Sequence, residues 1–125
     1  MTRILCVEDN DDNVFMLHRR LSRAGFEVIV AHNGAEGVAL AASERPDLIV
    51  MDLNLPVLDG WEATRQIKSR AETKQIPIIV LSGHSMPSHR EKALAAGADA
   101  FESKPVNFES FVEKVRALLG QSAGA

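Results

Sequence analysis

Three acidic residues stand directly after predicted apolar strands, where a parallel sheet would place reactive side chains. Glu8 and Asp9 follow the run Ile4–Val7, and Asp52 follows Leu48–Met51. Carboxylates held close together raise one another's pKa unless a cation lies between them. Mg²⁺ suits such a cluster because it prefers oxygen ligands and keeps several of its waters. The three acids therefore predict a magnesium site.

Two more polar side chains occupy equivalent positions further along the chain. Ser82 follows the apolar run Ile78–Leu81, and Lys104 comes shortly after Ala100–Glu102. A lysine ammonium beside carboxylates supplies a counter-charge and can bind a phosphoryl group. A serine alone is usually a turn residue, but next to such a lysine its hydroxyl can donate to a phosphoryl oxygen. Polar side chains at four of the five strand ends are therefore the main functional signal in the sequence.

Helical patterns separate the apolar runs and give them their order. The predicted helices are Asp12–Ala24, Asn33–Glu44, Asp59–Arg70, Ser88–Ala96 and Asn107–Leu119, and a fifth strand is predicted at Glu27–Ala31. Continuous apolar runs are typical of strands covered on both faces. Strict alternation of strand and helix then predicts an α/β fold, a doubly wound parallel sheet with helices on both faces. Functional sites of such sheets lie at the carboxyl ends of the strands.

Composition excludes several classes of protein. The 125 residues form one predicted domain over residues 1–120, with a short flexible tail at 121–125, and 46% are hydrophobic. A single cysteine, Cys6, excludes a disulfide framework. No apolar run approaches the roughly 20 residues of a membrane span, and acids follow the first residues too closely for a signal peptide. We therefore expect a cytoplasmic protein that does not bind membranes.

The net charge is −3, from 14 basic and 17 acidic residues, which argues against a nucleic-acid-binding domain. The acidity is local. Five acids lie at the predicted site or its rim, and the remaining 12 acids and 14 bases leave a charge of +2; the five are Glu8, Asp9, Asp11, Asp12 and Asp52. Asp11 and Asp12 open a predicted helix, where acids suit the helix dipole.

Four segments, in order, resemble the receiver domain of two-component response regulators. They are VEDN followed by Asn13, LIVMDLNLPVLDGWE, IPIIVLSGHSM and AGADAFESKP. Together they span essentially the whole chain, so the resemblance is to a single-domain response regulator with no output domain. It implies a flavodoxin-like sheet with strand order 2-1-3-4-5.

The resemblance also implies a role for each site residue. Asp52 would accept a phosphoryl group from a phosphohistidine donor, Lys104 would bind that group and Ser82 would hydrogen-bond it. Phe101 would be the switch aromatic. The implied Mg²⁺ ligands are Asp9, Asp52 and the backbone carbonyl of Asn54, with Glu8 acting indirectly or through water. Asn54 and His84 would flank the phosphoryl group and tune its hydrolysis.

Partner surfaces can also be predicted. At 100° per residue, Phe15 lies opposite the buried face of the first helix and should point to solvent. With Val14 and His18 it would dock a sensor histidine kinase or a histidine phosphotransferase. A downstream protein target would bind the surface formed by Ser88–Ala96, Ala100–Glu102 and Asn107–Leu119.

Three departures and three alternatives qualify the resemblance. Glu8 stands where Asp is commoner, Ser82 where Thr is commoner, and Phe101 has no hydroxyl. A flavodoxin would need a glycine- and hydroxyl-rich loop where this chain has EDNDD. An aspartate-nucleophile phosphatase would carry its nucleophile after the first strand and would add a cap domain. A third alternative is a receiver-like interaction module that works without phosphorylation.

Overall fold

The computed structural model describes residues 2–53, 55, 57–83, 87–104 and 106–123. Five parallel strands form one sheet in the order β2-β1-β3-β4-β5, which confirms the predicted fold and strand order. Each strand agrees with its predicted range to within one residue at either end. The strands are β1 Arg3–Val7, β2 Glu27–Ala31, β3 Leu48–Asp52, β4 Ile78–Ser82 and β5 Ala100–Ser103. Asp52 and Ser82 are therefore the last residues of their strands rather than loop residues.

A helix follows every strand. The helices are α1 Asp11–Arg23, α2 Gly34–Glu44, α3 Gly60–Ser69, α4 Pro87–Ala95 and α5 Phe108–Ala123. Side chains cap the first three helices, because Asn10, Asn33 and Asp59 each accept a hydrogen bond from the backbone N–H three residues later. In the part of the chain that the structure describes, none of these helices is long and apolar enough to span a membrane.

Most helix boundaries differ from the prediction by one residue, and the end of α5 differs by more. The N-cap of α1 is Asn10, so the helix begins at Asp11 rather than Asp12. Helix α5 continues to Ala123, past the predicted end at Leu119, and so includes residues 121–123 of the predicted tail. Gly120 is the only weak helix former in this stretch, and the Gln, Ser and Ala that follow it are compatible with a helix.

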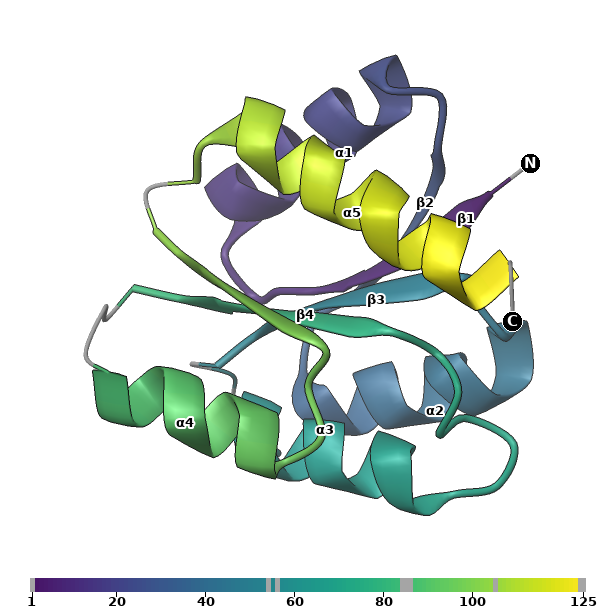
Figure 1. Cartoon of the computed structure of the whole chain (residues 1–125), viewed down its shortest axis with the longest axis vertical. Helices are drawn as coiled ribbons and strands as arrows, with labels where there is room; N and C mark the ends of the chain where they lie inside the picture. Colours follow the sequence, from purple (N-terminus) through teal and green to yellow (C-terminus); the bar gives the residue numbers. More distant parts are fainter. Residues whose placement is uncertain (1, 54, 56, 84–86, 105, 124–125) are drawn as a thin grey trace.

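Alternation of side chains along the strands builds two cores, one on each face of the sheet (Figure 1). Helices α1 and α5 cover one face, and α2, α3 and α4 cover the other. Ile4, Cys6 and Val50 point toward the first pair, where they pack with Leu21 and Phe111. The intervening residues of the same strands face α2–α4. Burial on both faces explains why the strands are continuously apolar.

A lysine holds the edge of the sheet opposite the predicted site. Lys68 Nζ of α3 donates to the carbonyl oxygens of Lys74 (3.2 Å) and Ile76 (2.7 Å) and pairs with Asp99 Oδ2 at 2.8 Å. The same Asp99 oxygen accepts the N–H of Ile78 at 2.9 Å. The Lys68 side chain is only 16% exposed, and its hydrogen bond to the Ile76 carbonyl is part-buried.

Replacing Lys68 with Met is expected to lower the free energy of unfolding by about 1–2 kcal/mol, because it removes the donor to the part-buried Ile76 carbonyl and the ion pair with Asp99. Urea denaturation at pH 7 measures the change. The matched control is Lys74→Met, which removes an exposed ammonium and should alter stability by less than about 0.5 kcal/mol. Equal midpoints for the two variants would contradict the structural role of Lys68.

Candidate functional site

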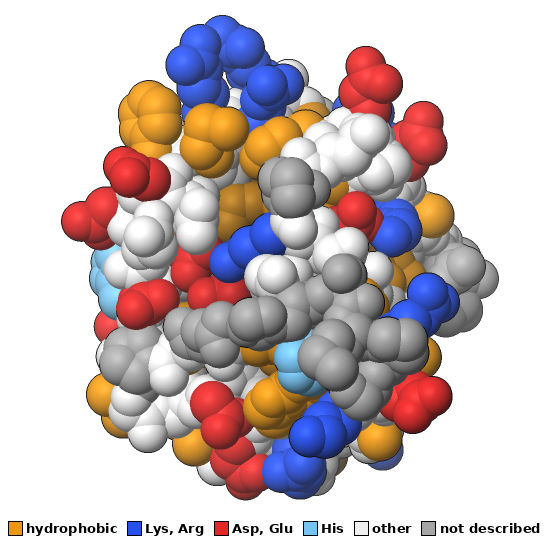
Figure 2. All heavy atoms as spheres, turned by 90° about the vertical axis from the view of Figure 1, so that its left-hand side faces the viewer, with side chains coloured by type: hydrophobic (Ala, Val, Ile, Leu, Met, Phe, Trp, Pro, Cys, Tyr) orange, Lys and Arg blue, Asp and Glu red, His pale blue; other side chains and the backbone are white. Residues whose placement is uncertain are grey.

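Strand register brings the predicted site residues to one edge of the sheet. Val7, the last residue of β1, pairs with Met51 of β3, so the residues that follow them, Glu8 and Asp52, lie side by side. Asp52 in turn pairs with Leu81 of β4. Figure 2 faces this edge, where acidic side chains gather around a basic one.

Three carboxylates form the centre of the site. One carboxylate oxygen from each of Glu8, Asp9 and Asp52 lies within 4.8 Å of the others. Glu8 and Asp52 are buried, with 1% and 4% of their surface exposed, whereas Asp9 is exposed. This set of oxygen donors, buried at its base and open at one side, fits a hard divalent cation such as Mg²⁺.

Lys104 supplies the positive charge at the base of the cluster. Its Nζ lies 3.0 Å from Asp52 Oδ1 and 3.5 Å from Glu8 Oε1. Its backbone N–H donates to the carbonyl oxygen of Ser82 at 2.8 Å, which fixes the start of the β5–α5 connection against β4. Burial alone would lower the pKa of Lys104, but Asp52 and Glu8 more than offset this effect and raise the pKa. Lys104 therefore remains charged.

The Glu8 carboxyl has a perturbed acid–base equilibrium. Burial, followed by the hydrogen bond and negative charge of Asp52, raises the pKa of Glu8 from 4.5 to about 7. Lys104 and Asn13 act in the opposite direction but do not cancel the increase. Near neutral pH this carboxyl is therefore partly protonated, and a cation in the cluster would compete with that proton.

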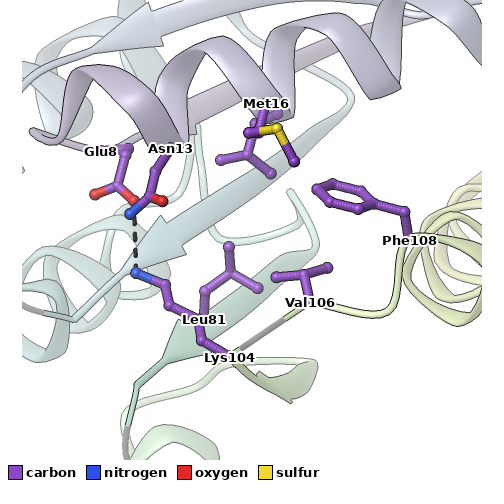
Figure 3. Close-up of a pocket in the computed structure, with 8 residues that line it drawn as sticks. Glu8, Asn13, Met16, Leu81, Lys104, Val106 and Phe108 are labelled. Atoms are coloured by element: carbon purple, nitrogen blue, oxygen red, sulfur yellow. Dashed lines mark hydrogen bonds and ion pairs between the residues drawn. The ribbon is translucent and has the colours of Figure 1, made fainter.

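Asn13 is a site residue whose role the sequence prediction missed. Its side chain lies against the Glu8 carboxyl and stabilises the charged form through a hydrogen bond (Figure 3). The backbone N–H of Asn13 donates to the N-cap Asn10, which orients the first turn of α1. In the sequence, Asn13 stands five positions after Glu8, with the cap residue Asn10 between them. This spacing was the available sign that the first turn of the helix could bring Asn13 back to Glu8.

A cavity of about 230 Å³ opens between α1 and the β5–α5 connection. Glu8 and Lys104 form its charged end, joined by the dashed line in Figure 3. Apolar side chains form most of the remaining wall, among them Met16, Val106 and Phe108. The guanidinium of Arg20 lies 5.0 Å from the centre of the Phe108 ring. The charged cluster thus has an apolar flank on this side.

Two further predicted site residues, Ser82 and Phe101, lie on β4 and β5. Ser82 is 2% exposed at the end of β4, between β3, which ends at Asp52, and β5, which Lys104 follows. Phe101 on β5 is half-buried and packs against the core beneath α2–α4. Asn54 and His84, the two residues predicted to tune hydrolysis, lie outside the described residues.

The predicted docking residues lie in the first two turns of α1. Phe15 is 63% exposed, which confirms the orientation expected from helical periodicity. His18 is also exposed, and its Nδ1 lies 3.5 Å from Ser22 Oγ. Val14 is half-buried and offers less surface than its neighbours. The adjacent Met16, 44% exposed, extends the apolar surface toward the cavity.

Comparison with known proteins agrees with this geometry. Protein PilH of Pseudomonas aeruginosa is 37% identical over 119 residues, which cover 95% of this chain and 98% of PilH. The polar-differentiation response regulator DivK of Brucella anthropi is 34% identical, with 95% and 97% of the two chains covered.

Two solved structures have the same fold. A putative response regulator from Chloroflexus aurantiacus superimposes with a TM-score of 0.92 at 29% identity, covering 95% of this chain and 98% of that one. The receiver domain of the sensor histidine kinase PA1611 from P. aeruginosa gives a TM-score of 0.84 at 33% identity, covering 99% and 98%. A magnesium ion is coordinated in its active-site cleft.

The response regulator receiver domain family matches residues 4–116 of the chain. That range includes all five strands and the whole acidic cluster with its lysine. The chain therefore belongs to the family of response regulator receiver domains.

Proposed function

We propose that this chain is a single-domain response regulator whose Asp52 accepts a phosphoryl group from a phosphohistidine donor. The observation that carries the proposal is the contact of Lys104 Nζ with Asp52 Oδ1 inside a cluster of three carboxylates. An aspartate that only ends a strand would not require an ammonium and two further carboxylates around it. The relatives PilH and DivK, which the chain covers almost completely, support the same assignment.

Phosphoryl transfer exchanges one bond to phosphorus for another. A carboxylate oxygen of Asp52 attacks in line, the P–N bond of the donor breaks and a P–O bond forms. The donor imidazole leaves with the electron pair of the broken bond. Lys104, now paired with Asp52, then binds the transferred phosphoryl oxygens and offsets their charge.

Mg²⁺ would be held by Asp9, Asp52 and the backbone carbonyl of Asn54, with Glu8 contributing indirectly or through water. The acidic cluster supports this role for its three carboxylates, and Asn54 is assigned from the family resemblance alone. When bound, Mg²⁺ offsets negative charge on the phosphoryl oxygens. Glu8 and Asn13 then act as positioning groups, because the Asn13 amide holds the Glu8 carboxyl at the base of the cluster.

A phosphorylated Asp52 carries roughly −1.5 to −2 charges and new acceptor oxygens. The Ser82 hydroxyl would donate to one of these oxygens, and the connection after β4 would follow it. Phe101 would repack in response and alter the surface of α4, β5 and α5 that binds a downstream protein. His84 and Asn54 would set the lifetime of the acyl phosphate by controlling access of water.

The donor is a sensor histidine kinase or a histidine phosphotransferase, and the encounter takes place in the cytoplasm. Its docking surface consists of Val14, Phe15 and His18 on α1. Phe15 supports this assignment best, because 63% of this large apolar side chain is exposed and available to a partner.

Incubation with acetyl phosphate and Mg²⁺ is expected to add one phosphoryl group to the wild-type chain and none to Asp52→Asn, because the amide is not a nucleophile. Intact-protein mass spectrometry measures both. Asp12→Asn is the matched control: it removes an exposed acid from the first turn of α1 and should be labelled like the wild type. Labelling of Asp52→Asn would show that another residue is the acceptor.

Lowering the pH from 8 to 6 is expected to weaken Mg²⁺ binding about tenfold, because the pKa of Glu8 is about 7 and its proton competes with the cation. Isothermal titration calorimetry measures the affinity. In Glu8→Gln most of this pH dependence should disappear. Stability of the metal-free protein should change in the opposite direction, falling as the pH rises from 4.5 to about 7. Over this range the Glu8 carboxyl has lost its proton in the unfolded chain but still holds it in the folded one.

Phe15→Ala is expected to slow phosphotransfer from a phosphorylated histidine phosphotransferase at least fivefold, because an interface anchor of this size contributes about 1 kcal/mol or more. Labelling by acetyl phosphate should not change, since a small donor needs no docking surface. Leu94→Ala on α4, which also removes an exposed apolar side chain, is the control. Equal rates for Phe15→Ala and wild type with the protein donor would exclude this surface.

A further inference from the structure

A groove of about 410 Å³ runs between α1 and α5, the two helices that cover one face of the sheet (Figure 1). At one end the guanidinium of Arg20 lies 5.0 Å from the centre of the Phe108 ring. At the other end Arg116 Nη2 donates to the carbonyl oxygen of Ala24 at 3.4 Å. None of the three clustered carboxylates lines this groove. Its volume falls within the roughly 300–1,000 Å³ that is typical of small-molecule sites.

Three arginines line the groove: Arg20, Arg23 and Arg116. None of the ion pairs between described residues involves any of them. The negative end of the α1 dipole, capped by Ala24, favours positive charge here. Each guanidinium nevertheless has five N–H donors, of which Arg116 uses one on Ala24. The fork of a guanidinium matches the oxygens of a phosphate group, so the groove suits a phosphorylated ligand.

The chemical character of the groove changes along α5, from aromatic and acidic, through apolar and acidic, to basic. The residues of α5 that line it are, in this order, Phe108, Glu109, Val112, Glu113 and Arg116. From Phe108 to Arg116 the helix rises about 12 Å at 1.5 Å per residue. Arg23 belongs to the basic end, because its neighbour Ala24 contacts Arg116. A ligand that fills the groove therefore needs different groups at its two ends.

This order corresponds to the three parts of a nucleotide. A base can stack against the pair formed by Arg20 and Phe108, since bases stack on both guanidinium planes and aromatic rings. Glu109 lies next to that pair and can accept hydrogen bonds from the N–H groups of the base. Glu113, one turn further along α5, can accept from the ribose hydroxyls.

The basic end of the groove can bind the phosphates. Arg23 and Arg116 approach this end from the two helices, so they can contact different phosphate groups. The two glutamates would repel a ligand made of phosphates alone. A ligand without phosphates would leave both arginines without an anionic partner. Only a molecule that carries N–H and O–H donors at one end and phosphates at the other satisfies the whole groove.

We propose that the groove between α1 and α5 binds a nucleoside polyphosphate, with the base at Phe108 and the phosphates at Arg23 and Arg116. The ligand is bound and not consumed. This site is separate from the acidic cluster and does not depend on Asp52 as a phosphoryl acceptor. Because Arg20 follows shortly after His18 on α1, the bound nucleotide would lie beside the predicted docking surface for the donor protein.

The test compares GTP with inorganic triphosphate, which has the phosphates but neither base nor ribose. GTP is chosen because guanine offers neighbouring N–H donors to a carboxylate. Isothermal titration calorimetry on the full chain measures both affinities at low ionic strength, since salt screens such contacts. EDTA is present, so that no Mg²⁺ can bridge phosphates to the acidic cluster. GTP is expected to bind at one site, about tenfold or more tighter than triphosphate, because of its stacking and hydrogen-bonding contacts.

Two variants test the two ends of the groove. Arg23→Gln removes a phosphate contact and should weaken GTP binding about fivefold or more. Glu109→Gln should weaken GTP binding but tighten triphosphate binding, because it removes both an acceptor for the base and a negative charge. Arg90→Gln removes an exposed arginine from α4, on the other face of the sheet, and is the matched control. Asp52→Asn should also keep the wild-type affinity for GTP. The residues replaced in the first three variants are exposed, so these variants should keep the wild-type Tm.

Four results would overturn the proposal. The first is a wild-type chain that does not bind GTP, and the second is equal affinity for GTP and triphosphate, which would show that the base is not recognised. The third is an Arg23→Gln variant that binds GTP as tightly as Arg90→Gln does. The fourth is loss of GTP binding in Asp52→Asn, which would place the ligand at the acidic cluster. Tighter binding of both ligands by Glu109→Gln would likewise exclude its contact with the base.

Discussion

The electrostatic balance between three carboxylates and one ammonium is the constraint on which the site depends. Glu8 and Asp52 are almost fully buried side by side, an arrangement that would be unstable if both were ionised without a partner. Lys104 contacts both and remains charged. Lys104 does not fully offset the burial of Glu8 and the negative charge of Asp52, and the pKa of Glu8 is therefore raised. A proton, a divalent cation or a rearranged lysine can each satisfy this cluster, and the proposed chemistry uses the competition among them.

The fold serves this balance by fixing where each charge lies. Parallel register sets Glu8 beside Asp52, and a backbone hydrogen bond from Lys104 to Ser82 fixes the approach of the lysine. Close packing at Gly60 brings the start of α3 against the backbone of Asp52. Two apolar cores pack against the two faces of the sheet. Their packing stabilises the strands and so offsets the cost of burying the charges at the strand ends.

The sequence was sufficient to predict what depends on local pattern. Continuous apolar runs and cap residues such as Asn33 predicted the fold, and the strand-end acids predicted the cluster around Asp52. The strand order was predicted from the family resemblance. Properties that depend on three-dimensional contacts were not accessible. The role of Asn13 requires knowledge of how α1 is oriented over Glu8, and the groove that ends at Arg116 requires knowledge of how α1 and α5 pack together. The end of α5 was placed too early because helix continuation past Gly120 has no strong local signal.

The lysine that fastens the far edge of the sheet has a mechanical consequence for α4. Lys68 binds Asp99, four residues beyond the end of this helix, and its stem lies against Gly97, where a Cβ atom would approach to 2.8 Å. Among the described residues of the helix, Ala93 contributes a buried methyl group, and the ring of His89 lies 6.0 Å from that of Trp61 on α3. Helix α4 is thus tied to α3 at two places, through His89 within the helix and through Lys68 just beyond its C-terminal end. A shift of α4 on the sheet would therefore also change its contacts with α3.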